Sequence, residues 1–381
     1  MKKLKVLFLA FFVSVTIFIS FLFLSPLKPA YADQLRSDIA SGNNIGGLVY
    51  MHLSTGSDFD NQTWEVAGNL GLPGYTWVAD FNGDGKSDIA SASATGNKVY
   101  MALSIGSDFD NKTWHVPLGQ WGLADYTWVG DFNGDGKSDI ASADGNNVYM
   151  HLSTGSRFDN QSWEVAGNLS MLGYTWVGDF NGDGKSDIAS AKKGNVYMAL
   201  STGSNFDNQT WKVPLKWGKA NYTWVADFNG DGKSDIASAD GGKVYMHLST
   251  GSHFAHQTWL VPPIEWGKAD YTWVADFNGD GKSDIASAFG NQVYMHLSTC
   301  SHFNNKTWHV PLGQWGLADY TWVADFNGDG KSDIASAKKG NVYMHLSTGS
   351  KFDHQTWDVR AFQWGKAGYT WVGDFNGDGK S

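Results

Sequence analysis

The motif DFNGDGKSD recurs along the chain at an almost constant interval. Its seven copies begin 51, 48, 48, 49, 49 and 49 residues apart, at Asp80, Asp131, Asp179, Asp227, Asp276, Asp325 and Asp374. A period near 50 residues with strand-like content is typical of a β-propeller or a similar array. The last copy stops at Ser381, so the sequence breaks off before the final Asp of the motif.

Each repeat is predicted to contain four strands, as the repeat that begins near residue 222 illustrates. Residues 222–228 and 234–239 are short stretches rich in aromatic and β-branched residues on either side of a Gly-rich turn. Residues 243–249 alternate between apolar and polar side chains, and residues 257–262 complete the unit as the fourth strand. No segment combines helix caps with helical periodicity, so the sequence predicts an all-β fold.

The N-terminal part of the chain contains the missing half of the seventh motif. Residues 36–41 read RSDIAS and align with KSDIAS at residues 86–91, so Asp38 takes the place of the absent Asp. The sequence therefore predicts a seven-bladed β-propeller of four-stranded blades. Its closing blade would combine one C-terminal strand with three N-terminal strands, which removes open sheet edges. A truncated longer array is the alternative.

Residues 1–32 have the pattern of a secretory signal peptide. The basic start MKKLK precedes an apolar stretch from Val6 to about Leu27 and small residues at Ala30 and Ala32. Cleavage before Asp33 would leave residues 33–381 as a single propeller that is secreted or held at the cell surface. An uncleaved membrane anchor is the alternative, and no membrane span is expected after cleavage because no second apolar run of spanning length follows.

The net charge and the single cysteine exclude some classes of partner and one way of stabilising the fold. The net charge is −10, and removing Lys2, Lys3, Lys5 and Lys28 with the signal peptide would make it −14. An acidic exported chain is a poor nucleic-acid binder, so no nucleic-acid partner is expected. Cys300 is the only cysteine, which excludes an internal disulfide framework. Because the acidic residues are concentrated in the repeated motif, the sequence indicates that the protein binds cations.

The spacing D-x-N-x-D-G-x-x-D predicts a Ca²⁺ loop. It places oxygen ligands at positions 1, 3, 5 and 9 and a backbone carbonyl at position 7, and Gly85 at position 6 permits the left-handed turn that such a loop needs. An EF-hand is excluded because position 12 is Ser91 rather than Glu and the flanks are strands. Asx-turns without metal remain the structural alternative.

Seven copies predict about seven Ca²⁺ per chain, whose charge of +14 would balance the mature chain. The predicted ligands of the complete copies are Asp80, Asn82, Asp84, Lys86, Asp88; Asp131, Asn133, Asp135, Lys137, Asp139; Asp179, Asn181, Asp183, Lys185, Asp187; Asp227, Asn229, Asp231, Lys233, Asp235; Asp276, Asn278, Asp280, Lys282, Asp284; and Asp325, Asn327, Asp329, Lys331, Asp333. The split copy would use Asp374, Asn376, Asp378, Lys380 and Asp38. Each Lys contributes its backbone carbonyl.

The unit YTWVADFNGDGKSDIASA resembles the FG-GAP/VCBS repeat. In that family the repeat builds the seven-bladed propeller of integrin α-subunits and of some fungal and bacterial lectins, and the Asp-rich loop between the first two strands binds Ca²⁺. The resemblance covers nearly the whole mature chain. It implies the fold and the metal, whereas the repeat serves adhesins, lectins, toxins and enzyme appendages alike.

A second pattern appears where the repeats differ. Five linkers into a blade carry a Trp and two do not, and five blades have His in the third strand where two have Ala102 and Ala199. The absences coincide blade by blade: the linkers at residues 68–74 and 167–173, which lack Trp, lead into the two blades with Ala. The five predicted pairs are Trp121 with His151, Trp217 with His247, Trp266 with His296, Trp315 with His345, and, through ring closure, Trp364 with His52.

We interpret the five pairs as sugar-binding sites in which Trp supplies an aromatic face and His a hydrogen bond. Simple packing of Trp on His, or descent of two blades from one variant, would also explain the coincidence. The predicted function is a multivalent lectin-like or adhesin-like module. A calcium-dependent scaffold that binds protein or wall polymer without sugar specificity is the alternative. A polysaccharide-degrading enzyme is not expected, because no set of catalytic residues occurs only once.

Overall fold

A computed structural model describes residues 36–42, 47–67, 70, 73–92, 96–122, 124–165, 174–214, 217–263, 265–359, 364–365 and 367–378. The predicted signal peptide, the linker at residues 167–173 and Lys380 lie outside the described residues. Within the described part, no helix is long and apolar enough to cross a membrane.

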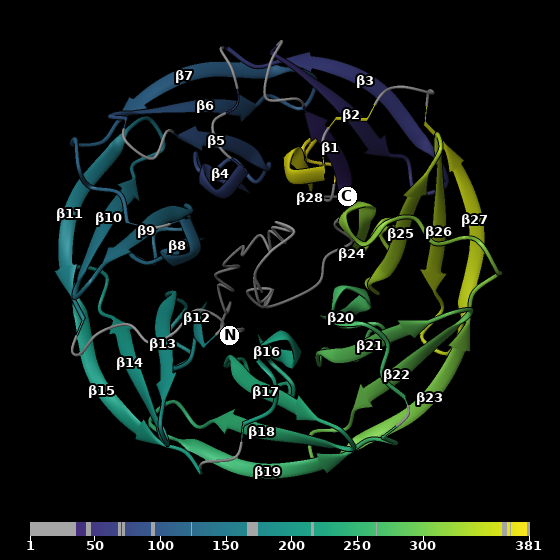
Figure 1. Cartoon of the computed structure of the whole chain (residues 1–381). Coiled ribbons are helices and arrows are strands. Elements are labelled where there is room, and N and C mark those ends of the chain that lie inside the picture. The colour runs from purple at the N-terminus through teal and green to yellow at the C-terminus, as the bar shows by residue number, and fades with distance from the viewer. Residues whose placement is uncertain are drawn as a thin grey trace, which may run out of the picture.

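Seven four-stranded antiparallel sheets are arranged around a central axis, with the first strand of each sheet innermost (Figure 1). This arrangement confirms the predicted seven-bladed propeller. The closing blade has the strand order β28-β1-β2-β3, and Asp38 in β1 lies opposite Gly373 in β28. The predicted 1+3 closure is therefore confirmed.

The strand bounds repeat from blade to blade. The closing blade contains β28 (Thr370–Gly373), β1 (Asp38–Gly42), β2 (Leu48–Ser54) and β3 (Phe59–Glu65). The following blades are β4 (Thr76–Ala79), β5 (Asp88–Ala92), β6 (Lys98–Ser104) and β7 (Phe109–His115); β8 (Thr127–Gly130), β9 (Asp139–Asp144), β10 (Asn147–Ser153) and β11 (Phe158–Glu164); and β12 (Thr175–Gly178), β13 (Asp187–Lys192), β14 (Asn195–Ser201) and β15 (Phe206–Lys212).

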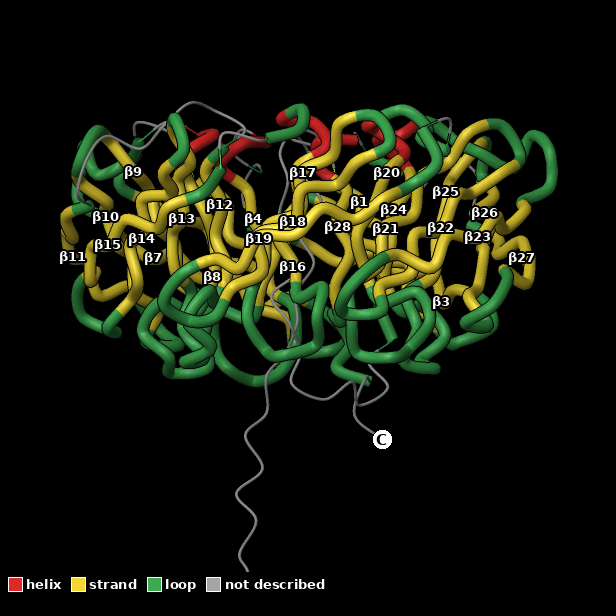
Figure 2. The backbone as a smooth tube through the Cα atoms, turned by 90° about the horizontal axis from the view of Figure 1, so that it is seen from below, coloured by secondary structure: helices red, strands yellow, loops and turns green. Residues whose placement is uncertain are grey.

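The remaining blades are β16 (Thr223–Ala226), β17 (Asp235–Asp240), β18 (Lys243–Ser249) and β19 (Phe254–Leu260); β20 (Thr272–Ala275), β21 (Asp284–Phe289), β22 (Gln292–Ser298) and β23 (Phe303–His309); and β24 (Thr321–Ala324), β25 (Asp333–Lys338), β26 (Asn341–Ser347) and β27 (Phe352–Asp358). Within the described residues, short 3₁₀ helices precede six of the first strands: η1 (Pro73–Tyr75), η2 (Ala124–Tyr126), η3 (Ala220–Tyr222), η4 (Ala269–Tyr271), η5 (Ala318–Tyr320) and η6 (Ala367–Tyr369). They gather on one face of the ring, and long loops extend from the opposite face (Figure 2).

The fourth strand differs from its prediction. We expected it at residues 257–262, but β19 begins at Phe254 and ends at Leu260. Thr250 and His253 close a tight turn, since the Thr250 N–H donates to the His253 carbonyl at 3.0 Å, and Phe254 then pairs directly with Ser249. The first residues of this strand were not predicted because most of its side chains between Phe254 and Trp259 are polar, and the strand exposes them to solvent.

Aromatic side chains hold neighbouring blades together. The Trp of each fourth strand contacts the first Phe of the next fourth strand edge-on, as in Trp64–Phe109 at 5.0 Å and, across the closure, Trp357–Phe59 at 4.8 Å. The Trp residues of the first and fourth strands are all at most 7% exposed. Both sets therefore form the inter-blade core, as expected for strand aromatics present in every repeat.

Candidate functional site: the Asp-rich loops and the Trp–His interfaces

The Asp-rich loops join the first and second strands of each blade, and each loop curls around its own carboxylates. Asp80 accepts backbone N–H groups from Gly83, at 2.6 Å, and Gly85, at 2.8 Å. Asp84 Oδ1 accepts the Lys86 N–H at 2.9 Å, and its Oδ2 pairs with Lys86 Nζ at 3.0 Å. Alternate residues 1, 3 and 5 of the motif thereby bring their oxygens to one small loop.

The last Asp of the motif accepts hydrogen bonds from two other segments of the chain. Asp88 is fully buried, and its two oxygens accept the N–H groups of Ser104, at 2.7 Å, and Phe81, at 3.0 Å. Burial raises the pKa of Asp88 well above the usual aspartate value, the Ser104 N–H lowers it, and the charge of Asp80 raises it further. This carboxylate therefore joins the Asp-rich loop to the end of the third strand, β6.

The chemistry of the donor set fits a hard cation. Burial and, to a smaller extent, the charge of Asp84 raise the pKa of Asp80, so one Lys does not compensate the carboxylates of a loop. Oxygen donors on alternating residues suit Ca²⁺. In the described part of the chain, no three His, Cys, Asp or Glu side chains are drawn together as a metal cage. The calcium sites therefore stay a prediction.

The closing loop is assembled from both ends of the chain. Asp38 Oδ1 accepts the Ser54 N–H at 2.7 Å, and its Oδ2 accepts the N–H groups of Phe375 and Asn376 at 3.0 and 3.2 Å. Arg36 Nη2 lies 3.1 Å from Asp378 Oδ2, where the other loops place the Lys of motif position 7. Asp38 thus occupies the predicted place of the missing Asp.

Hydrogen bonds between adjacent loops run around the whole ring. The N–H of the Ser at motif position 8 donates to the carbonyl of the first Asp of the preceding loop, from Ser138 to Asp80 at 2.8 Å and, across the closure, from Ser37 to Asp325 at 2.8 Å. The same bond occurs at all seven interfaces. The Asp-rich loops therefore form one continuous belt on their face of the propeller.

The five predicted Trp–His pairs are in contact. Their ring centroids lie 4.6 Å apart in Trp364–His52, 4.8 Å in Trp121–His151, 4.5 Å in Trp217–His247, 4.9 Å in Trp266–His296 and 5.1 Å in Trp315–His345. We call each of these places a Trp–His interface and name it by its His. Each linker Trp also stacks on the first-strand Trp of the preceding blade, for example Trp121 on Trp77 at 5.7 Å. The linker Trp therefore lies between two blades.

The His of each interface is held from two sides. His52, His151 and His296 place Nδ1 2.6, 2.7 and 2.7 Å from the Oδ1 of an Asn in the fourth strand: Asn61, Asn160 and Asn305. In the other two interfaces a His replaces the Asn, with Nδ1–Nδ1 distances of 2.9 Å for His247–His256 and 3.0 Å for His345–His354. All five His side chains of the third strands are at most 2% exposed.

Burial lowers the pKa of His151, His247, His296 and His345. The shift reaches about 3 for His247, where burial is the larger cause and the nearby His256 the smaller. His345, next to His354, has the same shift to about 3. These four imidazoles are therefore neutral at physiological pH, with one ring nitrogen protonated and the other not.

The Gly after each linker Trp brings the linker into contact with the second strand. A Cβ on Gly122 would lie 1.8 Å from the Ala143 carbonyl oxygen, and the Gly122 N–H donates to Ser142 Oγ at 2.8 Å. Tyr75 of the preceding blade donates its hydroxyl to the Gly122 carbonyl at 2.7 Å. The dipeptide Trp-Gly is thus a structural unit of the linker, and comparing the linkers for Gly as well as Trp would have found it.

Buried polar atoms without a hydrogen-bond partner gather at the Trp–His interfaces. Of eight such side-chain atoms in the described part, six lie there: Gln120 Oε1, His247 Nε2, Glu265 Oε2, Gln314 Oε1, His345 Nε2 and Trp364 Nε1. Every one of the five interfaces holds at least one of them. Gln120, Glu265 and Gln314 directly precede the linker Trp, a position that the sequence comparison did not single out.

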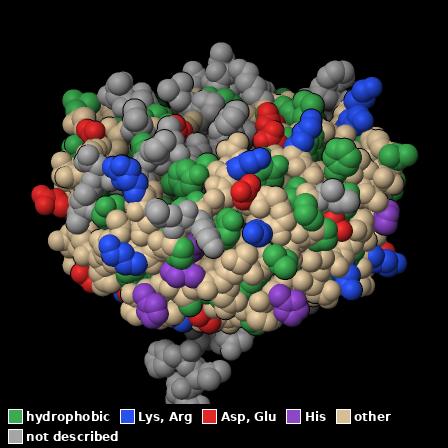
Figure 3. Space-filling view, turned by 60° about the horizontal axis from the view of Figure 1, so that its bottom comes forward, with side chains coloured by type: hydrophobic (Ala, Val, Ile, Leu, Met, Phe, Trp, Pro, Cys, Tyr) green, Lys and Arg blue, Asp and Glu red, His purple; other side chains and the backbone are tan. Residues whose placement is uncertain are grey.

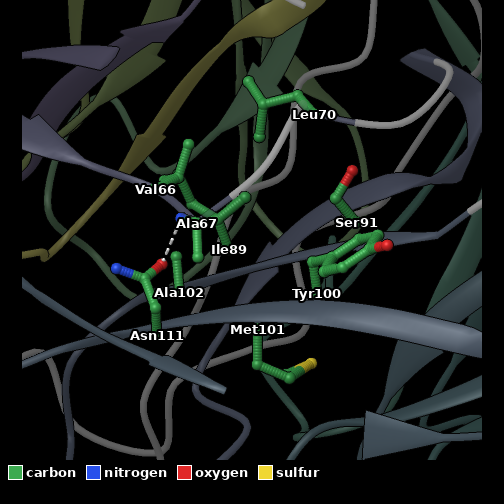
Figure 4. A pocket seen from close by; sticks show the side chains of 9 residues that line it. All are labelled: Val66, Ala67, Leu70, Ile89, Ser91, Tyr100, Met101, Ala102 and Asn111. Atoms are coloured by element: carbon green, nitrogen blue, oxygen red, sulfur yellow. Dashed lines mark hydrogen bonds between the residues drawn. The ribbon is translucent and has the colours of Figure 1, made fainter. Parts of the chain in front are cut away.

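The interface of the blade with Ala102 is built differently. A small pocket of about 10 Å³ lies between Leu70, Val66, Ile89, Tyr100 and Ala102, in the space where other blades have Trp and His (Figure 4). Asn111, which has no His to bind, accepts the Ala67 N–H at 2.8 Å instead. A cavity of this size holds about one water molecule, so this pocket takes no sugar ring as it stands.

The face drawn in Figure 3 has a mixed character where it is coloured. On the coloured part of the face in Figure 3, Lys and Arg side chains alternate with Asp, Glu and hydrophobic side chains. Basic side chains on this face are separated by acidic and apolar ones.

A family comparison matches most of the chain. The sequence profile of the FG-GAP-like repeat matches residues 80–142, 131–190, 227–299 and 325–381. A comparison with curated proteins finds no match.

Solved structures with similar folds include a lectin. An Agrocybe aegerita lectin, described as specifically recognising non-reducing terminal N-acetylglucosamine, is 20% identical with a TM-score of 0.71, over 91% of this chain and 96% of that chain. The Photorhabdus luminescens Tc holotoxin pore is 16% identical with a TM-score of 0.50, over 83% of this chain and 16% of that chain. At such identities these similarities concern the fold.

Proposed function

Since the chain belongs to the FG-GAP-like repeat family, we propose that it is a multivalent carbohydrate-binding propeller with its sites at the five Trp–His interfaces. The observation that carries this proposal is the placement of the unpartnered polar atoms, which occur at all five interfaces. A buried polar atom without a partner costs free energy, about 1–3 kcal/mol, and a ligand hydroxyl at that atom recovers it. Saccharides present many such hydroxyls.

The construction of the interfaces supports a polar ligand with an apolar side. Four linker Trp side chains are partly exposed and offer part of their rings near the unpartnered atoms, whereas Trp121 is buried, with 8% exposure. Each linker Trp stacks on the first-strand Trp of the neighbouring blade, which fixes the orientation of its ring. A ring that is already ordered loses less entropy when a ligand binds. The similarity in fold to a lectin agrees with this proposal.

Near-identical sites around one ring suit a surface that displays many copies of a ligand. Weak sites on one rigid body gain avidity when several engage the same surface. The proposal places the protein outside the cytoplasm, based on residues 1–32, and gives it a binding role without catalysis.

Calcium belongs to the same proposal. Asp80, Asn82, Asp84 and Asp88, with the Lys86 carbonyl, would hold the ion in the first loop, and the equivalent residues would hold it in the others. Bound Ca²⁺ would neutralise these carboxylates. A calcium-dependent scaffold without sugar specificity is the second candidate, and it is supported by the hydrogen-bonded belt that already joins the loops.

The number of binding sites tests the proposal. Isothermal titration with a saccharide identified on a glycan array, beginning with N-acetylglucosamine oligomers, should saturate near five sites per chain. The double variant Trp266→Ala with His296→Ala should lose one site. Leu312→Ala, which changes a side chain that is 81% exposed, is the control and should retain all sites. Absence of binding to every glycan would favour the scaffold.

A further inference from the structure

The His296 interface is the one interface among those described whose unpartnered oxygen belongs to a carboxylate. Glu265 stands directly before the linker Trp266, where the His151 and His345 interfaces have Gln120 and Gln314. Glu265 Oε2 is buried without a hydrogen-bond partner, like Gln120 Oε1 and Gln314 Oε1. Glu and Gln have nearly the same shape, but an ionised Glu265 carries a negative charge that Gln120 and Gln314 lack.

The backbone of Glu265 is fixed on both sides. Its N–H donates to the Pro262 carbonyl at 3.0 Å, and its carbonyl lies 3.3 Å from His296 Nε2. Trp266 donates its indole N–H to the Gly241 carbonyl at 2.8 Å. The carboxylate therefore projects from a rigid part of the linker, which is a requirement for selective recognition.

The charge of Glu265 has no partner in the described part of the protein. No Lys, Arg or His side chain there forms an ion pair with it, although such pairs exist elsewhere, for example Lys282 with Asp280 at 3.0 Å. Glu265 as a whole is half-buried, and the burial of part of its carboxyl group raises its pKa. An ionised carboxylate recovers more free energy from an ammonium group than from a hydroxyl.

An aromatic side chain marks the same interface. The second strand of this blade, β21, ends in Phe289, which is 64% exposed, whereas β9, β13, β17 and β25 end in Asp144, Lys192, Asp240 and Lys338. A Cβ on Gly267 would lie 1.9 Å from the Ala288 carbonyl oxygen, so the linker of Glu265 crosses the strand directly before Phe289. Exposed aromatic rings attract cations as well as sugar rings.

We infer that the His296 interface selects saccharides with a free, protonated amine over neutral saccharides, and that Glu265 is the residue that determines this specificity. The inference rests on the proposed function, since it names the ligand class of one of the five proposed sites. An amino sugar whose ammonium group meets Glu265 Oε2 would supply the missing cation. The interfaces with Gln120 and Gln314 keep an amide at this place and accept neutral hydroxyl donors.

The test compares glucosamine tetrasaccharide with its fully N-acetylated counterpart by isothermal titration. At about pH 6, an amine with a pKa near that of an α-amino group is protonated. The wild type should bind the free-amine tetrasaccharide at one site per chain about tenfold more tightly than the acetylated one, as expected for a charge-assisted hydrogen bond. Glu265→Gln should remove this site's preference, and Gln314→Glu should produce two amine-selective sites.

The outcomes separate the inference from the proposed function. Binding of acetylated sugar by the wild type, with an amine preference that is absent or survives Glu265→Gln, would overturn the inference and leave the proposed function standing. No binding of either sugar, or of any other glycan, would overturn both. Thermal melting of each variant verifies folding. Gln314→Glu is expected to gain an amine-selective site, and a misfolded protein would not gain one.

Discussion

Arg36 Nη2 lies 3.1 Å from Asp378 Oδ2 and thus joins the first described residues of the chain to the last. The complete loops make the same contact within one segment, as Lys86 Nζ does with Asp84 Oδ2 at 3.0 Å. The split loop therefore reproduces the internal loops, with an Arg from the N-terminal part in the place of the Lys. The ring is held at its closure by the same interactions as elsewhere.

Removing the carboxylate of Asp38 should open this closure. Asp38→Ala leaves the buried N–H groups of Ser54 and Phe375 without their acceptor, so we expect the free energy of unfolding to fall by about 3 kcal/mol. Urea unfolding followed by tryptophan fluorescence measures the change. Asp110→Ala, which breaks only an exposed ion pair with Lys112, is the control and should stay within about 0.5 kcal/mol. Equal stability of both variants would contradict the role of Asp38.

Adding one methyl group at Gly122 should disrupt an inter-blade contact. The new Cβ would lie 1.8 Å from the Ala143 carbonyl, so the linker must move away from the second strand, at a cost of about 1–3 kcal/mol. The melting temperature reports this change. Gly145→Asn is the matched control, because no atom lies within 4 Å of a Cβ there and Asn tolerates its φ of +64°. A similar melt for both would show that the linker is free to shift.

The two His–His contacts should make the propeller sensitive to acid. In the folded state the pKa of His247 and of His345 is lowered to about 3, first by burial and then by the neighbouring His, whereas the unfolded chain binds these protons near pH 6.5. The unfolded state therefore binds more protons between about pH 6.5 and 3, and stability falls as the pH falls through this window. Above it the contribution to stability is complete.

At about pH 4.5 the loss should amount to about 2–3 kcal/mol for each pair. His256→Asn with His354→Asn recreates the Asn partner found at His151, so these variants should lose less stability on acidification than the wild type. Burial, the larger cause of the shift, remains in the variants, so part of the acid sensitivity should persist. Melting curves at about pH 7 and about pH 4.5 give the comparison. An identical pH dependence of variant and wild type would exclude the His–His contacts as its source.

Chelation should destabilise the whole ring if the Asp-rich loops bind calcium. Excess chelator would leave the clustered carboxylates of every loop unneutralised, and because the loops are hydrogen-bonded into one belt, the melt should shift as a single transition. Restoring Ca²⁺ should recover the melting temperature, and Mg²⁺ should recover less of it because it requires a stricter octahedral geometry. An unchanged melt in chelator would remove the calcium prediction.

The pairing of Trp with His illustrates what a comparison of repeats can predict. Two residues about 30 positions apart, such as Trp121 and His151, are absent together in two repeats, and the structure places the rings of the pair 4.8 Å apart. Contact was predictable because substitution at one position changes the space at the other. The unpartnered Gln120 Oε1 was not predictable, since a polar residue in a linker is ordinary until its surroundings are known.

The sequence by itself determined the number of blades, the strand alternation and the closure through Asp38, because each follows from a period or from a count that does not depend on neighbours. Only the tertiary structure decided what each polar group meets. Glu265 and Gln314 occupy the same repeat position, and each has a buried side-chain oxygen without a hydrogen-bond partner, which belongs to a carboxyl group in one interface and to a neutral amide in the other. The reason is physical: hydrogen bonds and desolvation depend on atoms from two blades at once, whereas the repeat pattern records one blade at a time.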